Sequence, residues 1–173
     1  MPNPDRDQKD FRAVRLRPVT LADAPFLREL FATTRADELA LMGWNENQKE
    51  AFIVMQFNAQ SQQYAMSYPQ AHHSLILLNE NSIGRLIIDR GENGFTLVDI
   101  ALLPAHRGAG IGTHLIEELL DEAGSARKPV TLNVWHSNPA KRLYERLGFS
   151  AANKEGVYCE MSWNPELASR ASE

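Results

Sequence analysis

Cysteine is almost missing from this sequence: Cys159 is the only one in 173 residues. A single cysteine can form neither an internal disulfide nor a cysteine-rich zinc site. Disulfides are typical of secreted proteins, so the composition favours an intracellular, cytoplasmic protein. The adjacent His72 and His73 lack metal-ligand spacing with acidic residues, and we expect no metal site.

Long hydrophobic runs and a strong charge of one sign are missing too. Apolar stretches such as residues 75–78 fit buried strands and fall far short of the roughly 20 residues that cross a bilayer. Residues 1–10 have no apolar core, so we expect neither a signal peptide nor a membrane span. Eighteen Lys and Arg stand against 22 Asp and Glu, a net charge of −4. This balance gives no electrostatic footprint for nucleic acid or for an anionic membrane surface.

What is present suits one globular domain of mixed α+β class. Hydrophobic residues make up 43% of the chain, which is sufficient for a core. We expect a flexible arm over residues 1–12, one domain over 13–164 and a tail over 165–173. Thr20 followed by Asp23 is close to a capping box, and Asn138-Pro139 is typical of a helix start. Periodicity predicts strands over residues 14–17, 74–79, 82–89, 95–103, 129–135 and 157–163, and helices after residues 20, 47, 111 and 138.

The strongest chemical signal is the segment from Arg107 to Thr113, where Gly108, Gly110 and Gly112 alternate between a strand and a helix. Glycines let the backbone turn and come close to a ligand. The first N–H groups of a helix lack internal partners and attract negative charge, so a diphosphate is a natural occupant. Arg107 adds a positive charge. A glycine-rich turn with no ligand is the alternative, which Arg107 and the following helix disfavour.

Two other phosphate-binding motifs do not fit this segment. The nucleotide P-loop needs a lysine after its last glycine, and here Gly112 is followed by Thr113. The dinucleotide fingerprint needs two residues between its second and third glycines and stands near the start of a βαβ unit. The observed spacing, late in the chain after a meander, argues against a Rossmann domain and a nicotinamide oxidoreductase.

Two motifs in register resemble the GNAT superfamily of N-acyltransferases. Arg107-Gly-Ala-Gly-Ile-Gly112 is similar to the family's acetyl-CoA-binding signature Arg/Gln-x-x-Gly-x-Gly/Ala. The segment from Asn138 to Phe149 is similar to its Asn-x-x-Ala-x-x-Leu-Tyr-Glu-x-x-Gly-Phe segment, one residue shorter between Asn and Ala. The resemblance covers about residues 14–163. It implies a three-layer α/β/α fold with a mixed, mostly antiparallel sheet of about six to seven strands and about four helices.

The resemblance also implies a cosubstrate, acetyl-CoA, and the residues that bind it. The pantetheine arm would lie along Leu102 and Leu103, and Asn138 would reach the pantetheine or the reacting end. The sheet would splay between strands ending near Leu103 and His136, with the acyl group in the gap. The backbone amides that would hold the pyrophosphate run through the loop, at Arg107, Gly108, Ala109, Gly110, Ile111, Gly112 and Thr113.

Amide formation from a thioester needs a deprotonated amine, donors for the oxyanion and a proton for the departing thiolate. The resemblance implies direct attack in a ternary complex. It places Tyr144 near the CoA sulfur as the candidate acid, although its position between Ala140 and Leu147 also fits a core tyrosine. Asp99, in the central strand, is a candidate base, and so are Glu38, His72, His73 and His136. Cys159 lies far along the chain in an expected strand, which disfavours an acyl-cysteine route.

The acceptor is the least determined part. The resemblance places its site over residues 38–68, which are rich in aromatic residues and Gln, and the family includes homodimers. Lys141, Arg142 and Arg146 form a basic edge that would meet the CoA 3′-phosphate or simply face solvent. The expected function is acetyl transfer to a primary amine of a small molecule or peptide. A catalytically silent acyl-CoA-binding regulatory module is the alternative, which an acid at Tyr144 disfavours.

Overall fold

The computed structural model describes residues 11–153 and 157–166. These residues form one seven-stranded sheet in the order β1-β2-β3-β4-β5-β7-β6. All neighbouring strands are antiparallel except β4 and β5, which are parallel. The strands are β1 Val14–Pro18, β2 His72–Leu78, β3 Asn81–Arg90, β4 Phe95–Leu102, β5 Val130–Trp135, β6 Ser150–Asn153 and β7 Tyr158–Trp163.

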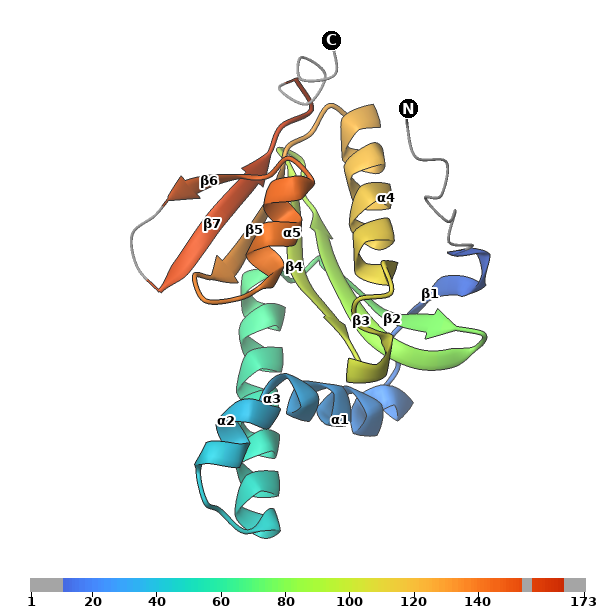
Figure 1. Cartoon of the computed structure of the whole chain (residues 1–173). Coiled ribbons are helices and arrows are strands. Elements are labelled where there is room, and N and C mark those ends of the chain that lie inside the picture. The colour runs from blue at the N-terminus through green and yellow to red at the C-terminus, as the bar shows by residue number, and fades with distance from the viewer. Residues whose placement is uncertain (1–10, 154–156, 167–173) are drawn as a thin grey trace, which may run out of the picture.

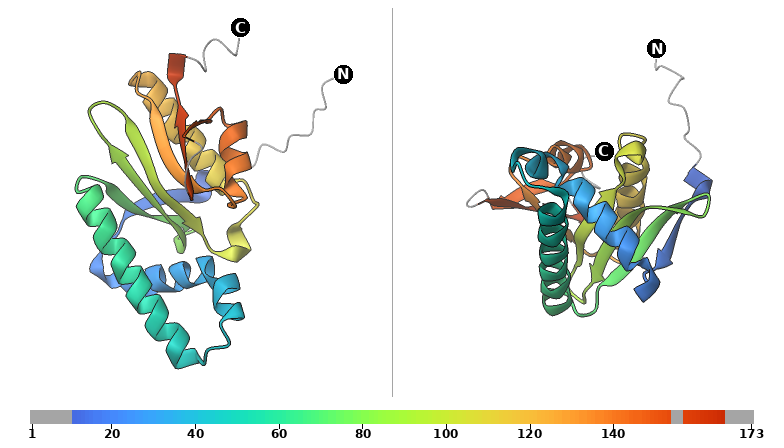
Figure 2. Two further views of the ribbon diagram at one scale, coloured as in Figure 1. Left: turned by 90° about the vertical axis from the view of Figure 1, so that its left-hand side faces the viewer. Right: turned by 90° about the horizontal axis from the view of Figure 1, so that it is seen from below.

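Helices cover the sheet on both sides, which gives three layers. The left view of Figure 2 shows the strands between α3 on one side and α4 and α5 on the other. The helices are α1 Ala24–Thr34, α2 Ala36–Leu41, α3 Glu46–Ser67, α4 Ile111–Ser125 and α5 Ala140–Arg146. Three 3-10 helices accompany them within the described residues: η1 Phe11–Ala13, η2 Leu21–Asp23 and η3 Pro104–His106. None of the described helices is both long and apolar enough for a membrane span.

Two hydrophobic cores lie on opposite faces of the sheet. The larger one packs α4 and α5 against the sheet and contains the side chains of Ile116, Leu132, Cys159 and Met161, all at most 2% exposed. The smaller one packs α1 and α3 against β2, around Phe31, Ile53, Phe57, Leu75 and Leu77. The strand alternation separates the two sets, because successive side chains point to opposite faces.

The parallel pair β4 and β5 separates after three residue pairs. Phe95, Thr96 and Leu97 pair with Val130, Thr131 and Leu132, and no later residues pair. The register between β3 and β4 shifts at the same point, because Ile87 pairs with Asp99 and Ile88 with Leu97. Val98 is thus an extra residue in β4, and such a bulge bends its strand. Figure 1 shows β5, β7 and β6 diverging from β3 and β4 below this point.

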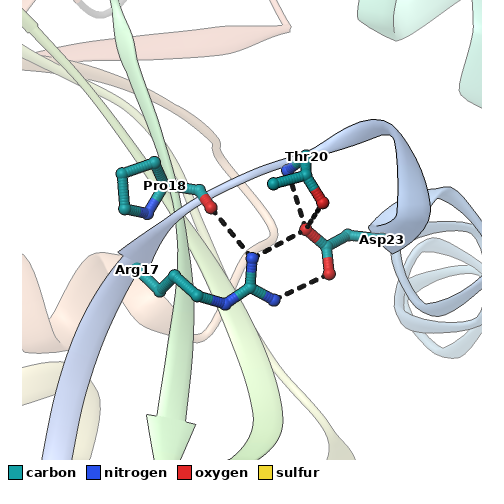
Figure 3. Close-up of polar contacts among 4 residues, drawn as sticks. All are labelled: Arg17, Pro18, Thr20 and Asp23. Carbon is teal, nitrogen blue, oxygen red and sulfur yellow. Dashed lines mark hydrogen bonds and ion pairs between the residues drawn. The ribbon is translucent and has the colours of Figure 1, made fainter.

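A polar corner joins β1 to α1 (Figure 3). The Thr20 backbone N–H donates to the Asp23 carboxylate at 2.7 Å and completes the capping box with the Thr20 side chain. The Arg17 guanidinium donates to both carboxylate oxygens, at 2.7 and 3.0 Å. The hydrogen bond from Arg17 and then that from the Thr20 backbone lower the pKa of Asp23. The capping box that the sequence predicts at Thr20 is therefore confirmed.

The structure confirms all six expected strands and all four expected helices to within a few residues, and it adds short elements. Helix α2 and strand β6 were not predicted from the sequence. Strand β6 is a four-residue edge strand paired only with β7, and its small and polar residues give no strand signal. The described end of the expected arm packs on the domain, because the Phe11 ring stacks on His114 with centroids 4.5 Å apart. Residues 1–10 and 167–173 lie outside the described residues.

Candidate functional site

A cavity of about 900 Å³ passes through the gap between β4 and β5. Its walls include both strands beyond their last pair, from Val98 to Ala101 and from Asn133 to Trp135. Asn138 and Tyr144 reach it from the side of α5, while α1 and α3 contribute residues from the opposite side. The splayed sheet expected between the ends of these strands is therefore present. Two ligands that enter from opposite faces would meet there.

The glycine loop lies on the α4 side, directly after β4. Gly108 and Gly110 have φ angles of 71° and 89°, a left-handed region that L side chains rarely adopt. Gly110 is the N-cap of α4, and as a glycine it has no side chain that could cap the helix. The first helical bond is His114 N–H to Gly110 C=O, so Ile111, Gly112 and Thr113 have no N–H partner within the helix. Their three N–H groups can hold an anion.

A steric observation at Gly112 supports a ligand here. A Cβ atom at Gly112 would lie 3.9 Å from Ile100 and 4.0 Å from Leu102, which are ordinary contacts. The packing of the protein therefore does not require a glycine at this position. Close approach of a ligand to the first turn of α4 would require one. The residues of the loop thus fit a diphosphate-bearing group such as that of acetyl-CoA.

Arg107 is already engaged by the protein. Its Nε donates to the Leu102 carbonyl oxygen at 2.8 Å, and its Nη2 donates to Thr33 Oγ1 at 3.2 Å. Its backbone N–H donates to Pro104 within η3. The side chain fastens the loop to the end of β4 and to α1. Its positive charge remains near the loop, but its backbone amide is used internally, which the sequence did not indicate.

The backbone of β4 is open toward the gap. Leu103 N–H bonds to Ile83 C=O of β3, at the point where β4 has just ended. Because N–H groups alternate along a strand, the Leu102 N–H points toward the open side. Gly84 of β3 lies opposite Leu102, and a Cβ there would collide with the Ala101 carbonyl oxygen. Glycine at this position keeps β3 and β4 close beside the gap.

Tyr144 belongs to the core and to the cavity at once. It is 7% exposed and its ring packs edge-on against Phe149, with centroids 5.8 Å apart. Its hydroxyl makes no hydrogen bond with another described residue, and its side chain lines the cavity. Burial, and then the charge of Asp99, raises the pKa of Tyr144 to about 12. The phenol therefore keeps its proton at neutral pH.

Asp99 forms a partly buried ion pair in the wall of the cavity. Its Oδ2 accepts from Arg85 Nε at 2.8 Å and lies 2.7 Å from Arg85 Nη2. Arg85 is 7% exposed, and its Nη2 also donates to Gln60 Oε1 of α3 at 3.0 Å. Burial, followed by the charge of Asp99, raises the pKa of the nearby Tyr64. The sequence does not indicate a role for Arg85 or Gln60. Periodicity assigns Arg85 to a strand and Gln60 to a helix, but it does not show that Arg85 contacts Asp99 and Gln60.

Of the other candidate bases, some line the cavity and others lie elsewhere. Glu38 lines the cavity and is paired with Arg35 at 2.9 Å. His73 lies on β2, where burial and then Arg85 lower its pKa, and it is not part of the cavity wall. His136 lines a separate hollow of about 490 Å³ beside α5, together with Asn138, Lys141 and Arg142. Within the described residues no group of three or more metal-ligating side chains is gathered.

Cys159 is not part of the cavity wall. It is fully buried on β7 within the larger core, while its neighbour Tyr158 lines the cavity from the other face. Asn138 lines the cavity, and its Oδ1 accepts from the Ala140 N–H at 2.9 Å. Gly148, with a φ of 90°, ends α5 in the left-handed conformation.

Residues 69–151 match the model of the acetyltransferase (GNAT) domain family. This match contains the split strands, the glycine loop and α5. A curated relative, [ribosomal protein bS18]-alanine N-acetyltransferase of Haemophilus influenzae, is 33% identical over 97 residues. Residues 69–151, which carry the site, are therefore similar to the GNAT acetyltransferases.

That alignment covers 54% of this chain and 65% of the relative, so the chain spans just under two thirds of the relative's length. Solved GNAT structures share the fold across most of both chains. The PaiA N-acetyltransferase from Thermoplasma acidophilum, in complex with coenzyme A, has a TM-score of 0.66 at 16% identity and covers 87% of this chain and 98% of that one. An acetyltransferase from Thermus thermophilus gives 0.64 at 23%, covering 88% and 97%. The spermidine/spermine N-acetyltransferase SpeG from Vibrio cholerae gives 0.62 at 18%, covering 94% and 99%.

Proposed function

We propose that this protein is an acetyl-CoA-dependent N-acetyltransferase that acts on a primary amine of a small molecule or peptide. The observation that carries the proposal is the continuity of the site. A loop with free helix N–H groups leads along the open edge of β4 to the gap that holds Tyr144 and Asp99. The relative from Haemophilus influenzae acts on a ribosomal protein alanine, which favours a peptide amine among the acceptors.

When bound, acetyl-CoA would supply the thioester from which the acetyl group is transferred. The N–H groups of Ile111, Gly112 and Thr113 would hold its diphosphate, and the Leu102 N–H would bond its pantetheine arm. Leu103 lies at the turn that follows, and Asn138 lies at the cavity wall near the reacting end. Gly108 and Gly110 give the loop its left-handed turns around Ala109.

The chain's own residues can serve the two proton transfers. The Tyr144 phenol, which stays protonated at neutral pH, would donate to the departing sulfur. Asp99 lines the cavity and Arg85 contacts its Oδ2, so its Oδ1 would take the amine proton directly or through a water molecule. Direct attack by the amine in a ternary complex fits the cavity, because Cys159 is buried in the larger core and is not part of the cavity wall.

Release of CoA thiol from acetyl-CoA, measured over a panel of amines and peptides, tests the proposal. We expect turnover that depends on both the amine and acetyl-CoA, and stabilisation of the fold by CoA but not by NAD in a thermal shift. Binding of acetyl-CoA without turnover on any acceptor would favour a silent regulatory module instead. Absence of CoA binding would refute the proposal.

A further inference from the structure

The acceptor side of the cavity contains charged residues, but their charges are already paired. The charged side chains in its described wall are Arg35, Glu38, Arg85 and Asp99. Arg35 pairs with Glu38 at 2.9 Å, and Arg85 pairs with Asp99 at 2.7 Å. Glu38 is held by Arg35, and the remaining oxygen of Asp99 is assigned to the reacting amine, so neither carboxylate is left to neutralise a second positive charge on an acceptor.

The remaining polar groups of this wall are uncharged, and α3 supplies a row of them. Gln56, Gln60 and Gln63 are spaced by four and three positions, so they share one face of α3, and all three line the cavity. Gln60 uses its carbonyl oxygen to accept from Arg85, which leaves its amide N–H groups for a ligand. Gln56 and Gln63 make no side-chain hydrogen bond with the residues that the structure describes. We call these three residues the amide row.

Carboxamides donate and accept hydrogen bonds but carry no charge. They match amide or hydroxyl groups on a ligand, whereas a second ammonium group next to them would lose its hydration without a compensating anion. Two exposed rings, Trp135 and Tyr158, pack together at the same wall with centroids 4.4 Å apart. This surface suits an uncharged body that continues from the reacting amine.

We infer that the acceptor is a monoamine whose neighbouring groups are uncharged hydrogen-bonding groups, and that the amide row, through Gln56 and Gln63, excludes polyamines. This inference rests on the proposed function and specifies its substrate class. A peptide with a free α-amino group and an amino sugar share this chemistry. A polyamine does not, because its second ammonium group lies a few bonds from the first.

The first test compares kcat/KM of the wild-type protein for three acceptors: an alanine-initiated tripeptide amide, glucosamine and spermidine. We expect the tripeptide or glucosamine to exceed spermidine at least tenfold, and the better of the two identifies the source of the uncharged groups. Higher kcat/KM for spermidine would overturn the inference while leaving acetyl transfer established. No transfer to any amine would refute the proposed function and this inference with it.

The second test replaces two amides of the amide row with carboxylates. The double substitution Gln56→Glu with Gln63→Glu keeps side-chain size and helix propensity and adds two unpaired carboxylates. We expect kcat/KM for spermidine to rise at least fivefold through a lower KM, and the rise to shrink at high salt because exposed charges are screened. Gln62→Glu is the matched control, because Gln62 is exposed on α3 and outside the cavity wall.

CoA affinity, measured by calorimetry, should be the same in the wild-type protein, the double variant and the Gln62→Glu control. A double variant that folds, binds CoA and shows the wild-type preference would assign the selectivity elsewhere and contradict the inference. An equal gain in the Gln62→Glu control would also contradict it, since that result would reflect net charge rather than the wall of the cavity.

Discussion

The two faces of the sheet are built by different means. On the face of α4 and α5, a large apolar core includes Ile116, Leu132 and Met161, and the glycine loop and Tyr144 are attached to it. On the face of α1 and α3, the apolar core is smaller. This face also contains a polar network, in which Arg85 pairs with Asp99 and donates a hydrogen bond to Gln60. In the proposed function the first face would hold the cosubstrate, and the second would present polar groups to the acceptor.

This difference has a consequence for where substitutions act. Residues on the α4 and α5 face should control cosubstrate affinity and turnover, because they hold the loop and the candidate acid. Residues on the α1 and α3 face should control the KM for the acceptor. The gap between β4 and β5 connects the two faces of the sheet. It begins where the extra residue Val98 bends β4.

The largest effect should come from deleting the same side chain on each face. Ile116 on α4 is 1% exposed within the larger core, and Ile53 on α3 is 7% exposed within the smaller one. We expect Ile116→Ala to lower the free energy of unfolding by about 4 kcal/mol and Ile53→Ala by about 2 kcal/mol. The smaller core borders the cavity and can relax into the lost volume. Urea unfolding followed by circular dichroism measures both values, and equal losses would remove the contrast between the faces.

The next effect concerns turnover. Tyr144→Phe removes the phenol O–H and keeps the packing against Phe149, so we expect kcat to fall at least tenfold with little change in acetyl-CoA affinity. Tyr158→Phe, on the exposed rim of the acceptor side, is the control and should keep kcat within about twofold.

The pKa of Tyr144 adds a pH test. A phenol whose pKa is raised to about 12 stays protonated further into the basic range than a free tyrosine. The kcat of the wild-type protein should therefore show no loss of this proton up to about pH 10. Unchanged kcat in Tyr144→Phe would exclude the phenol as the acid and leave Tyr144 as a core residue.

The sequence predicted the α4 and α5 face better than the other, for a physical reason. The glycine loop, the Asn138 cap and Gly148 are defined by neighbours in the chain, and local conformational preferences reveal such features. The split of the sheet followed from the resemblance to GNAT proteins. Strand β6 escaped prediction because its four residues are placed only by pairing with β7.

The acceptor face depends on contacts between distant residues. Arg85 and Asp99 are 14 residues apart, and Gln60 is 25 residues from Arg85. Glu38 and Asp99 could be named as acidic residues, but only the structure shows that each has an arginine partner. The roles of Tyr144, Asp99 and the loop residues in binding and catalysis stay predictions that kinetics must test.

A smaller effect should separate a strained glycine near the site from one far away. Gly108 in the loop and Gly43 before α3 have φ angles of 71° and 62°, and a Cβ at either would meet no atom within 4 Å. Alanine should therefore strain both backbones equally, by about 1 kcal/mol. We expect Gly108→Ala to weaken CoA binding about five- to tenfold and Gly43→Ala to leave it unchanged. Calorimetric titration with CoA measures this, and equal effects would mean that general destabilisation weakens binding.

The smallest effect belongs to the polar corner between β1 and α1 (Figure 3), whose residues are not part of the cavity wall. Asp23→Asn keeps the shape of the side chain and removes its charge, so the bonds to Arg17 weaken and the melting temperature should fall slightly at pH 7. The exposed Asp121→Asn on α4 is the control. Because the folded state lowers the pKa of Asp23, its stabilisation is complete above the unfolded pKa near 4 and is lost as pH falls toward the folded pKa. The difference in melting temperature between wild type and Asp23→Asn should thus stay constant from pH 8 to 5 and shrink below about pH 4. A constant difference down to pH 3 would show that the variant acts through a lost cap and not through the charge of Asp23.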